Sequence, residues 1–167
     1  YKIYSMIIYL KNKDTLIVGD FYFQCCIGKN GLNSKKKEGD NTTPKGLFNL
    51  NKLYYRKDRV GPIKTKIKNK IITKKMGWCD DPSHKKYNEE ILVSNKNNRE
   101  IFYRKDHKYD YLITISHNQK KIPHEGSAIF IHLTDNYNPT AGCIALKKND
   151  FQILLMLIDQ KSKIKIG

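Results

Sequence analysis

The sequence predicts a mostly β domain of sandwich or barrel character with one main helix near its C-terminus. Short runs of β-branched and aromatic residues recur along the chain, separated by segments rich in Gly, Pro and Asn. Only one segment, near residues 150–160, has helical periodicity, and strands and helices do not alternate as they do in parallel βαβ folds. Because 167 residues suit one domain, we expect residues 1–167 to form a single unit.

The first half of the chain is predicted to consist of strands and one long loop. YKIYSMIIYL (1–10) has the composition of a strand rather than of a signal peptide. TLIVGDFYFQCCIG (15–28) is predicted to form a hairpin, because Gly19-Asp20 separates two strand-like runs. A polar loop at 28–46 follows, and loops of this length often carry function. LFNLNKLYY (47–55) is the next expected strand, and GPIK (61–64) is a break.

The second half contains another conspicuous loop, three expected strands and the helix. The loop is GWCDDPSHKKYN (77–88), and the strands are IFYR (101–104), YDYLITISHN (109–118) and GSAIFIHL (126–133). Asn149 or Asp150 is expected to cap a helix whose apolar face contains Phe151, Leu154, Leu155 and Ile158. KIKIG (163–167) is expected to close the chain as a short strand.

Composition restricts the partners. There are 32 Lys and Arg residues against 16 Asp and Glu, a net charge of +16 that suits nucleic acid, acidic lipid or an acidic wall polymer. We expect no nucleic-acid partner, because the lysines are scattered among Asn and Ile and no recognition helix or zinc spacing is present. We also expect no membrane insertion, because no apolar run approaches the roughly 18 to 20 residues that a spanning helix needs.

Four cysteines are too few and too scattered for a disulfide scaffold, and none forms a CxxC pair typical of structural zinc sites. Cys25 and Cys26 are expected to point to opposite faces of a strand, so at most one of them shares a face with Cys79. A bridge between Cys25 and Cys79 stays open. Asp80 and Asp81 could bind a metal or a cationic group, but a salt-bridged loop is favoured in so basic a chain. We expect no metal and no cofactor.

Cys143 in NYNPTAGCIAL (136–146) is the strongest candidate for chemistry. Pro139 and Gly142 place it at the end of an irregular loop, where backbone amides can face a developing oxyanion. His132, at the end of an apolar strand, is a suitable proton acceptor, and nearby positive charge is expected to favour the thiolate. The alternative is that Cys143 is a small buried hydrophobe, because sequence spacing does not show that the two side chains touch.

Four segments together resemble the YkuD-type L,D-transpeptidase catalytic domain, in the branch with a PTAGC-type cysteine motif. GSAIFIHL followed by PTAGCIAL is similar to the histidine-to-cysteine signature of that family. KKKEGDNTTPKGLF, GWCDDPSHKKYN and ISHN match further family segments in the same order, so the resemblance covers residues 17–160. It implies a β-rich, sandwich-like or barrel-like domain.

The resemblance also implies a cysteine acyltransferase acting on peptidoglycan stem peptides. Cys143 would attack the bond between the third-position diamino acid and D-Ala, and the thioester would pass to an amine. His132 would be the general base, oriented by the Leu133 carbonyl, with the amides of Gly142 and Cys143 as oxyanion donors. We expect a monomer that works in the periplasm or cell envelope, with the export signal not visible in this chain.

The chain departs from the commoner family signature, Ser-His-Gly-Cys followed by an Arg two residues after Cys. Here Thr140 and Ala141 precede Gly142, and the Arg position is Ala145. Binding of the donor carboxylate is therefore expected to move to Lys147 or Arg104. The full set of expected substrate-binding residues is Trp78, Asp81, His117, Asn118, Thr140 and Lys147. An L,D-carboxypeptidase and a non-catalytic wall-binding module stay as alternatives.

Overall fold

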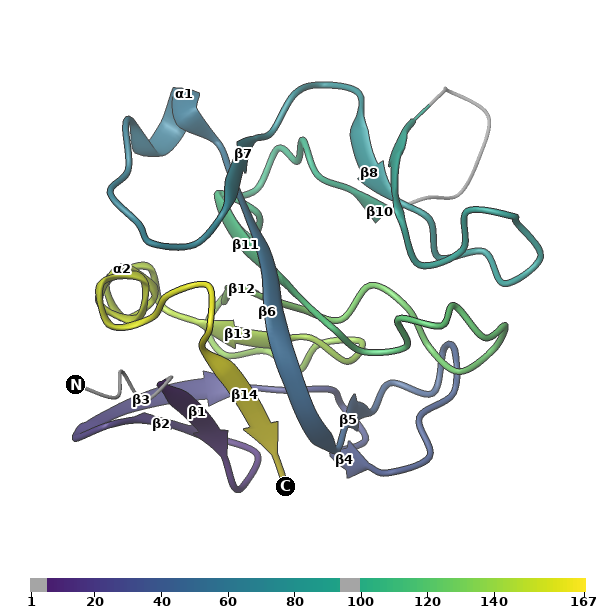
Figure 1. Ribbon diagram of the computed structural model, residues 1–167, viewed down its shortest axis with the longest axis horizontal. Coiled ribbons are helices and arrows are strands. Elements are labelled where there is room, and N and C mark those ends of the chain that lie inside the picture. Colours follow the sequence, from purple (N-terminus) through teal and green to yellow (C-terminus); the bar gives the residue numbers. More distant parts are fainter. Residues whose placement is uncertain (1–5, 94–99) are drawn as a thin grey trace.

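The computed structural model describes residues 6–93 and 100–167 (Figure 1). Strands account for 38% and helices for 9%, so the prediction of a mostly β domain with a C-terminal helix is confirmed. The elements, in chain order, are β1 (Ile7–Leu10), β2 (Thr15–Val18), β3 (Phe21–Cys26), β4 (Leu32–Asn33), β5 (Thr43–Pro44), β6 (Gly46–Tyr55), α1 (Lys57–Val60), β7 (Asn69–Ile71), β8 (Met76–Trp78), β9 (Glu90–Leu92), β10 (Glu100–Ile101), β11 (Tyr111–Ile115), β12 (Phe130–Leu133), β13 (Ile144–Leu146), α2 (Lys148–Leu157) and β14 (Lys163–Ile166).

Eight strands close into a barrel, which decides between the two predicted architectures. The strand order is β11-β12-β13-β3-β2-β1-β14-β6, and β6 pairs back onto β11, while β7 adds to the outer edge of β6. Closure leaves these eight strands without an exposed edge. The β12–β13 and β1–β14 pairs are parallel, whereas the β2–β3 hairpin is antiparallel as the sequence predicted.

Two hydrophobic clusters pack on opposite faces of the β11–β12 region. Alternate residues such as Ile113 and Ile131 point into the barrel, where Phe151 and Leu154 of α2 join the same core. The residues that precede them on the two strands, Leu112 and Phe130, point outward. They pack there against an aromatic cluster that includes Phe102, Tyr109 and Tyr54. The outer face of β12 is therefore buried rather than solvated.

The segment between β7 and β11 covers this outer cluster. It contains the small sheet β10-β8-β9, which Figure 1 places across the molecule from β1, β2 and β3. Trp78 of β8 packs against Phe102 and Phe130, with ring centroids 6.3 and 5.5 Å away. The segment thus forms a wall beside the barrel strands that carry the candidate catalytic residues.

Several predicted boundaries differ from the structure. Helix α2 begins after Lys147, whose side chain makes no capping hydrogen bond, so the prediction of Asn149 or Asp150 as the cap is wrong. Both residues lie in the first helical turn, where the Asp150 carboxylate complements the helix dipole. The short helix α1 was not predicted. Residues 1–5 of the expected first strand lie outside the described residues.

The expected strand at 126–133 is shorter than predicted. It begins at Phe130, because Gly126 and Ala128 adopt positive φ angles of 92° and 53°, outside the β region. Strand β10 likewise includes only Ile101 of IFYR, since Phe102 turns into the aromatic cluster. The long loop at 28–46 contains the two-residue strands β4 and β5.

Candidate active site

Cys143 and His132 lie on neighbouring parallel strands at the outer face of the barrel. His132 follows Phe130 by two residues, so both side chains leave the same face of β12. Cys143 immediately precedes β13, whose Ile144 is opposite Ile131, and it packs against the same outer aromatic cluster as Phe130. The fold therefore brings both candidates to one surface, which sequence spacing could not establish.

Both side chains line one cavity of about 350 Å³. Thr140 and Gly142 form part of its wall, as do residues of the two loops that the sequence singled out. The loop at 28–46 contributes Lys36 and Glu38, and the 77–88 loop contributes a single residue, Asp80. The cavity is large enough for part of a peptide, and its walls come from stretches far apart in the chain, at residues 36–39, 80, 100–109 and 127–145.

His132 is held in one tautomer. Its Nδ1–H donates to the Leu133 carbonyl oxygen at 2.8 Å, which leaves Nε2 unprotonated and able to accept a proton. The imidazole is buried, and its ring meets the Tyr109 ring edge-on with centroids 5.2 Å apart. Burial lowers the pKa of His132 to about 4, so the ring is neutral at physiological pH.

The burial and contacts of Cys143 favour its neutral thiol, not the thiolate that was expected from the sequence. Its Sγ–H donates to the Ala128 carbonyl oxygen at 3.2 Å, and Sγ accepts the Phe130 N–H at 3.4 Å. Burial raises the pKa of Cys143 to about 12, and this outweighs the lowering effects of the Phe130 N–H and of Lys36. The pair is therefore a neutral thiol and a neutral imidazole rather than an ion pair.

A tight turn holds the backbone before Cys143. The Thr140 hydroxyl donates to the Cys143 carbonyl oxygen at 2.6 Å and accepts the Gly142 N–H at 3.1 Å. The Gly142 amide, one of the two predicted oxyanion donors, is thus already engaged. The Cys143 amide, the other one, makes no hydrogen bond within the described parts of the chain.

Gly142 is required by a close approach. Its φ is +146°, and a Cβ added there would lie 2.8 Å from the Thr42 backbone oxygen. Backbone atoms cannot yield to a side chain as a flexible terminus does, so this position excludes every larger residue. The glycine preceding Cys143 therefore lets the 28–46 loop pack directly against the cysteine turn.

Comparison with known proteins assigns the family. The family model of the YkuD L,D-transpeptidase catalytic domain matches residues 4–166. The chain belongs to the YkuD family. YkuD domains are generally cell-envelope enzymes that bind peptidoglycan. The curated proteins contain no match to this chain.

Two solved structures share the fold of this YkuD domain. One is the helical cell shape determining protein Pgp2 from Campylobacter jejuni, with 16% identity and a TM-score of 0.51 over 98% of this chain and 47% of that one. The other is a point mutant of Pgp2, with 17% identity and a TM-score of 0.51 over 100% and 48%. The YkuD domain thus spans about half the length of these chains.

Most of the predicted substrate-binding residues lie outside the cavity wall; Thr140 lines it. The Trp78 indole is packed in the outer cluster and donates to Asn88 Oδ1 at 2.9 Å. Asp81 accepts the backbone N–H and hydroxyl of Ser83 and so organises its own turn. Lys147 is exposed, with its ammonium 5.3 Å from the centre of the Tyr137 ring.

His117 and Asn118 lie in a neighbouring turn of the YkuD domain. The His117 Nε2 contacts the Glu125 carbonyl oxygen at 3.0 Å, and burial lowers the pKa of this histidine. Asn118 donates from Nδ2 to the carbonyl oxygens of Ile122 and Gly126. These contacts shape the turn that leads into Ala128, the acceptor of the Cys143 thiol.

Sequence reasoning missed Asn88, which connects three segments around the site. Its Oδ1 accepts the Trp78 indole N–H and the Ala128 N–H, and its Nδ2 donates to the carbonyl oxygens of His117 and Asn118. Asn88 has a positive φ of 57°. A lone Asn at the end of a loop with many polar residues carries no sequence signal for such a role.

Arg104 is the predicted carboxylate-binding residue that does line the cavity. Its guanidinium contacts both Asp106 oxygens and lies 3.7 Å from Glu100 Oε1. Glu100 also accepts the Tyr109 hydroxyl at 2.6 Å. The cavity wall beside Cys143 therefore carries a connected set of charged groups. The positive charge of Arg104 is partly balanced there by Asp106 and Glu100.

Within residues 6–93 and 100–167, no cluster of three or more His, Cys, Asp or Glu residues is placed to hold a metal. Cys25 is a free thiol, so the Cys25–Cys79 bridge that the sequence left open is not formed. Among the described helices, none is both long and apolar enough to cross a membrane.

Proposed function

We propose that this YkuD domain is an L,D-transpeptidase that acts on peptidoglycan stem peptides through a thioester on Cys143. One observation carries the proposal: a single cavity contains both Cys143 and a buried His132 whose Nδ1 is fixed by the Leu133 carbonyl. This leaves an unprotonated Nε2 in the same cavity as a thiol, the arrangement that general-base activation of a nucleophile needs.

The first half of the proposed reaction begins from the neutral pair. As the donor stem binds, the Cys143 thiol leaves the Ala128 carbonyl and passes its proton to His132 Nε2. Sulfur attacks the carbonyl carbon of the third-position diamino acid, and the C–N bond to D-Ala breaks. The imidazolium returns the proton to the departing nitrogen, so D-Ala leaves with a neutral amine and the acyl group remains as a thioester.

The second half transfers the acyl group to an amine of another stem. The neutral His132 accepts a proton from the attacking amine, a new amide forms, and Cys143 recovers its proton as the thiol. No metal or redox partner is needed at any step, because each proton removed is returned. Water in place of the amine would give hydrolysis, the carboxypeptidase outcome.

Substrate binding is proposed at the cavity wall. Thr140 borders the nucleophile, and Arg104 is placed to bind the donor carboxylate. Trp78, Asp81, His117 and Asn118 lie behind this wall or in adjoining turns, from which they would act by holding it. Lys147 immediately precedes α2 and does not line the cavity. The net charge of +16 would attract acidic wall polymers in the cell envelope.

Incubation with a tetrapeptide stem tests the proposal. A cross-linked dimer with released D-Ala supports transpeptidation, release of D-Ala without dimer indicates a carboxypeptidase, and binding without release indicates a wall-binding module with a structural cysteine. Cys143→Ala should abolish release. Cys25→Ala is the matched control, because it removes a thiol that is buried in the barrel core and does not line the cavity, and it should leave release intact.

A further inference from the structure

A buried threonine on the 28–46 loop donates a hydrogen bond to the peptide group that precedes the nucleophile. Thr43 is fully buried, and its Oγ1–H donates to the Gly142 carbonyl oxygen at 2.8 Å. Thr43 Oγ1 in turn accepts the Gly28 N–H at 2.9 Å. Because a hydroxyl has one proton and that acceptor contact fixes its lone pair, the Thr43 proton is directed at Gly142.

This contact sets the direction of the Cys143 amide. The Gly142 C=O and the Cys143 N–H belong to one planar trans peptide, so they point in opposite directions. With the carbonyl held toward Thr43, the N–H faces away from the 28–46 loop. Within residues 6–93 and 100–167 the Cys143 N–H has no hydrogen-bond acceptor, and the nearby Thr140 hydroxyl is engaged with the Gly142 N–H and the Cys143 carbonyl. Gly142 and Cys143 both line the cavity, so the Cys143 N–H is available to a group that binds there.

We propose that Thr43 is a positioning residue that aims the Cys143 N–H at the oxyanion formed during acyl transfer. The proposal rests on the proposed function and deepens it. Two donors were expected from the sequence, the amides of Gly142 and Cys143, but the Gly142 N–H is engaged by Thr140. The Cys143 N–H is therefore the remaining donor of this turn, and its aim depends on the Thr43 hydroxyl.

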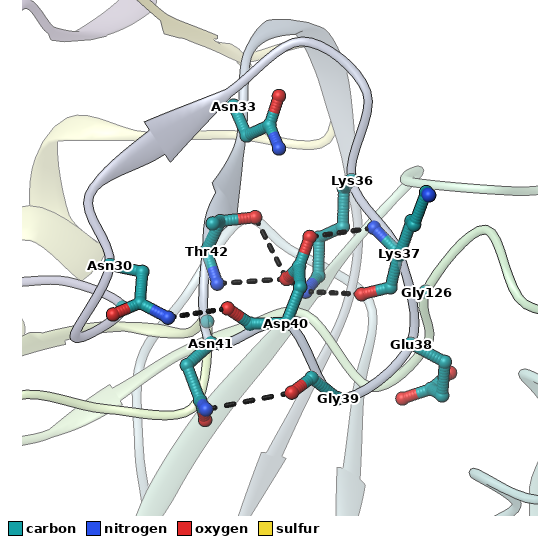
Figure 2. Close-up of polar contacts among 12 residues, drawn as sticks. Asn30, Asn33, Lys36, Lys37, Glu38, Gly39, Asp40, Asn41, Thr42 and Gly126 are labelled. Carbon is teal, nitrogen blue, oxygen red and sulfur yellow. Dashed lines mark hydrogen bonds and ion pairs between the residues drawn. The ribbon is translucent and has the colours of Figure 1, made fainter.

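The Asp40 carboxylate links several parts of the loop that carries Thr43. Figure 2 shows the Asp40 carboxylate accepting hydrogen bonds from Lys36 Nζ at 2.7 Å, the Lys37 N–H at 2.7 Å, and the N–H and hydroxyl of Thr42 at 2.9 and 2.8 Å. The Thr43 N–H also donates to the Gly31 carbonyl at 2.8 Å. The backbone N–H groups of Thr42 and Thr43 are thus both held by hydrogen bonds within the 28–46 loop.

Two reactions of Cys143 separate aim from nucleophilicity. Acylation by a carbapenem or a stem peptide passes through an oxyanion, whereas alkylation by iodoacetamide displaces iodide and forms none. Removing an oxyanion donor typically costs about 100- to 1,000-fold in rate. Thr43→Val leaves the Cys143 N–H present but removes the hydrogen bond that orients it. We therefore expect the acylation rate constant to fall about 10- to 100-fold while the alkylation rate constant stays unchanged.

Thr43→Ser keeps the hydroxyl and should retain acylation, which keeps the test valid if the valine variant folds poorly. Thr114→Val is the matched control, because Thr114 is also buried, does not line the cavity, and its hydroxyl also donates to a carbonyl, that of Lys52 on the neighbouring strand β6. Equal loss in the serine and valine variants, or a valine variant whose acylation-to-alkylation ratio matches wild type, overturns the proposal. Absence of acylation in the wild type instead refutes the proposed function itself.

Discussion

The pH dependence of Cys143 alkylation follows from the neutral thiol–imidazole pair. The pKa of Cys143 is raised to about 12 and that of His132 is lowered to about 4, in both cases by burial. At pH 7 such a thiol is only about 0.001% thiolate, whereas an unperturbed thiol of pKa about 8.5 is about 3% thiolate. Alkylation at pH 7 should thus be about 3,000-fold slower than that of a cysteine peptide.

The assay is iodoacetamide modification followed by peptide mapping across pH 5–9. Since the reactive form is the thiolate, the rate constant for Cys143 should rise about tenfold per pH unit from pH 7 to 9, without a plateau. His132→Ala should keep this slope, because the imidazole carries no charge in the free protein. A rate constant that is high and constant over part of pH 5–9 in the wild type, and low in His132→Ala, would reveal a thiolate–imidazolium pair and refute the reasoning.

Three further outcomes follow. Asn88→Ala should lower the free energy of unfolding by about 2–3 kcal/mol, because the N–H groups of Trp78 and Ala128 lose their acceptor; urea titration measures this, and a loss near zero contradicts the structural role. Lys147→Ala should leave acyl transfer unchanged, while Arg104→Ala should raise the Michaelis constant for the donor; the reverse result would place the carboxylate site at Lys147. The pKa of His132 is about 4 in the folded protein, below the unfolded value of about 6.5. The stability that comes from its neutral form is therefore fully present above pH 6.5 and is lost as the pH falls through 4. The free energy of unfolding from urea titration should therefore decline between pH 6.5 and pH 4 by up to about 3 kcal/mol, and His132→Gln should lessen this decline.

Local patterns predicted the fold class well, because strand alternation and turn residues are local signals. The β2–β3 hairpin, β6, β14 and the apolar face of α2 all follow from residues adjacent in sequence. Closure of the barrel does not, because it depends on the pairing of β6 with β11. The helix cap was misplaced by two or three residues because both acidic and amide side chains near its start are good caps in isolation.

The candidate site was predictable in its identity and unpredictable in its support. Cys143 and His132 stand in recognisable contexts, but their shared cavity arises from the parallel pairing of β12 and β13. Thr43 is about a hundred residues from the Gly142 carbonyl that it holds, so nothing local announces the contact. The thiol pKa was predicted in the wrong direction because burial by the outer aromatic cluster is a property of packing, not of the surrounding charges.

The most direct test of the central claim is the intact mass of the protein after exposure to a carbapenem, with the modified peptide then sequenced. We predict one covalent adduct, located on Cys143, which Cys143→Ala lacks and which His132→Ala forms far more slowly. A protein that gains no mass, or one that gains it at Cys25 or Cys26 while Cys143 stays free, would contradict the assignment of Cys143 as the nucleophile.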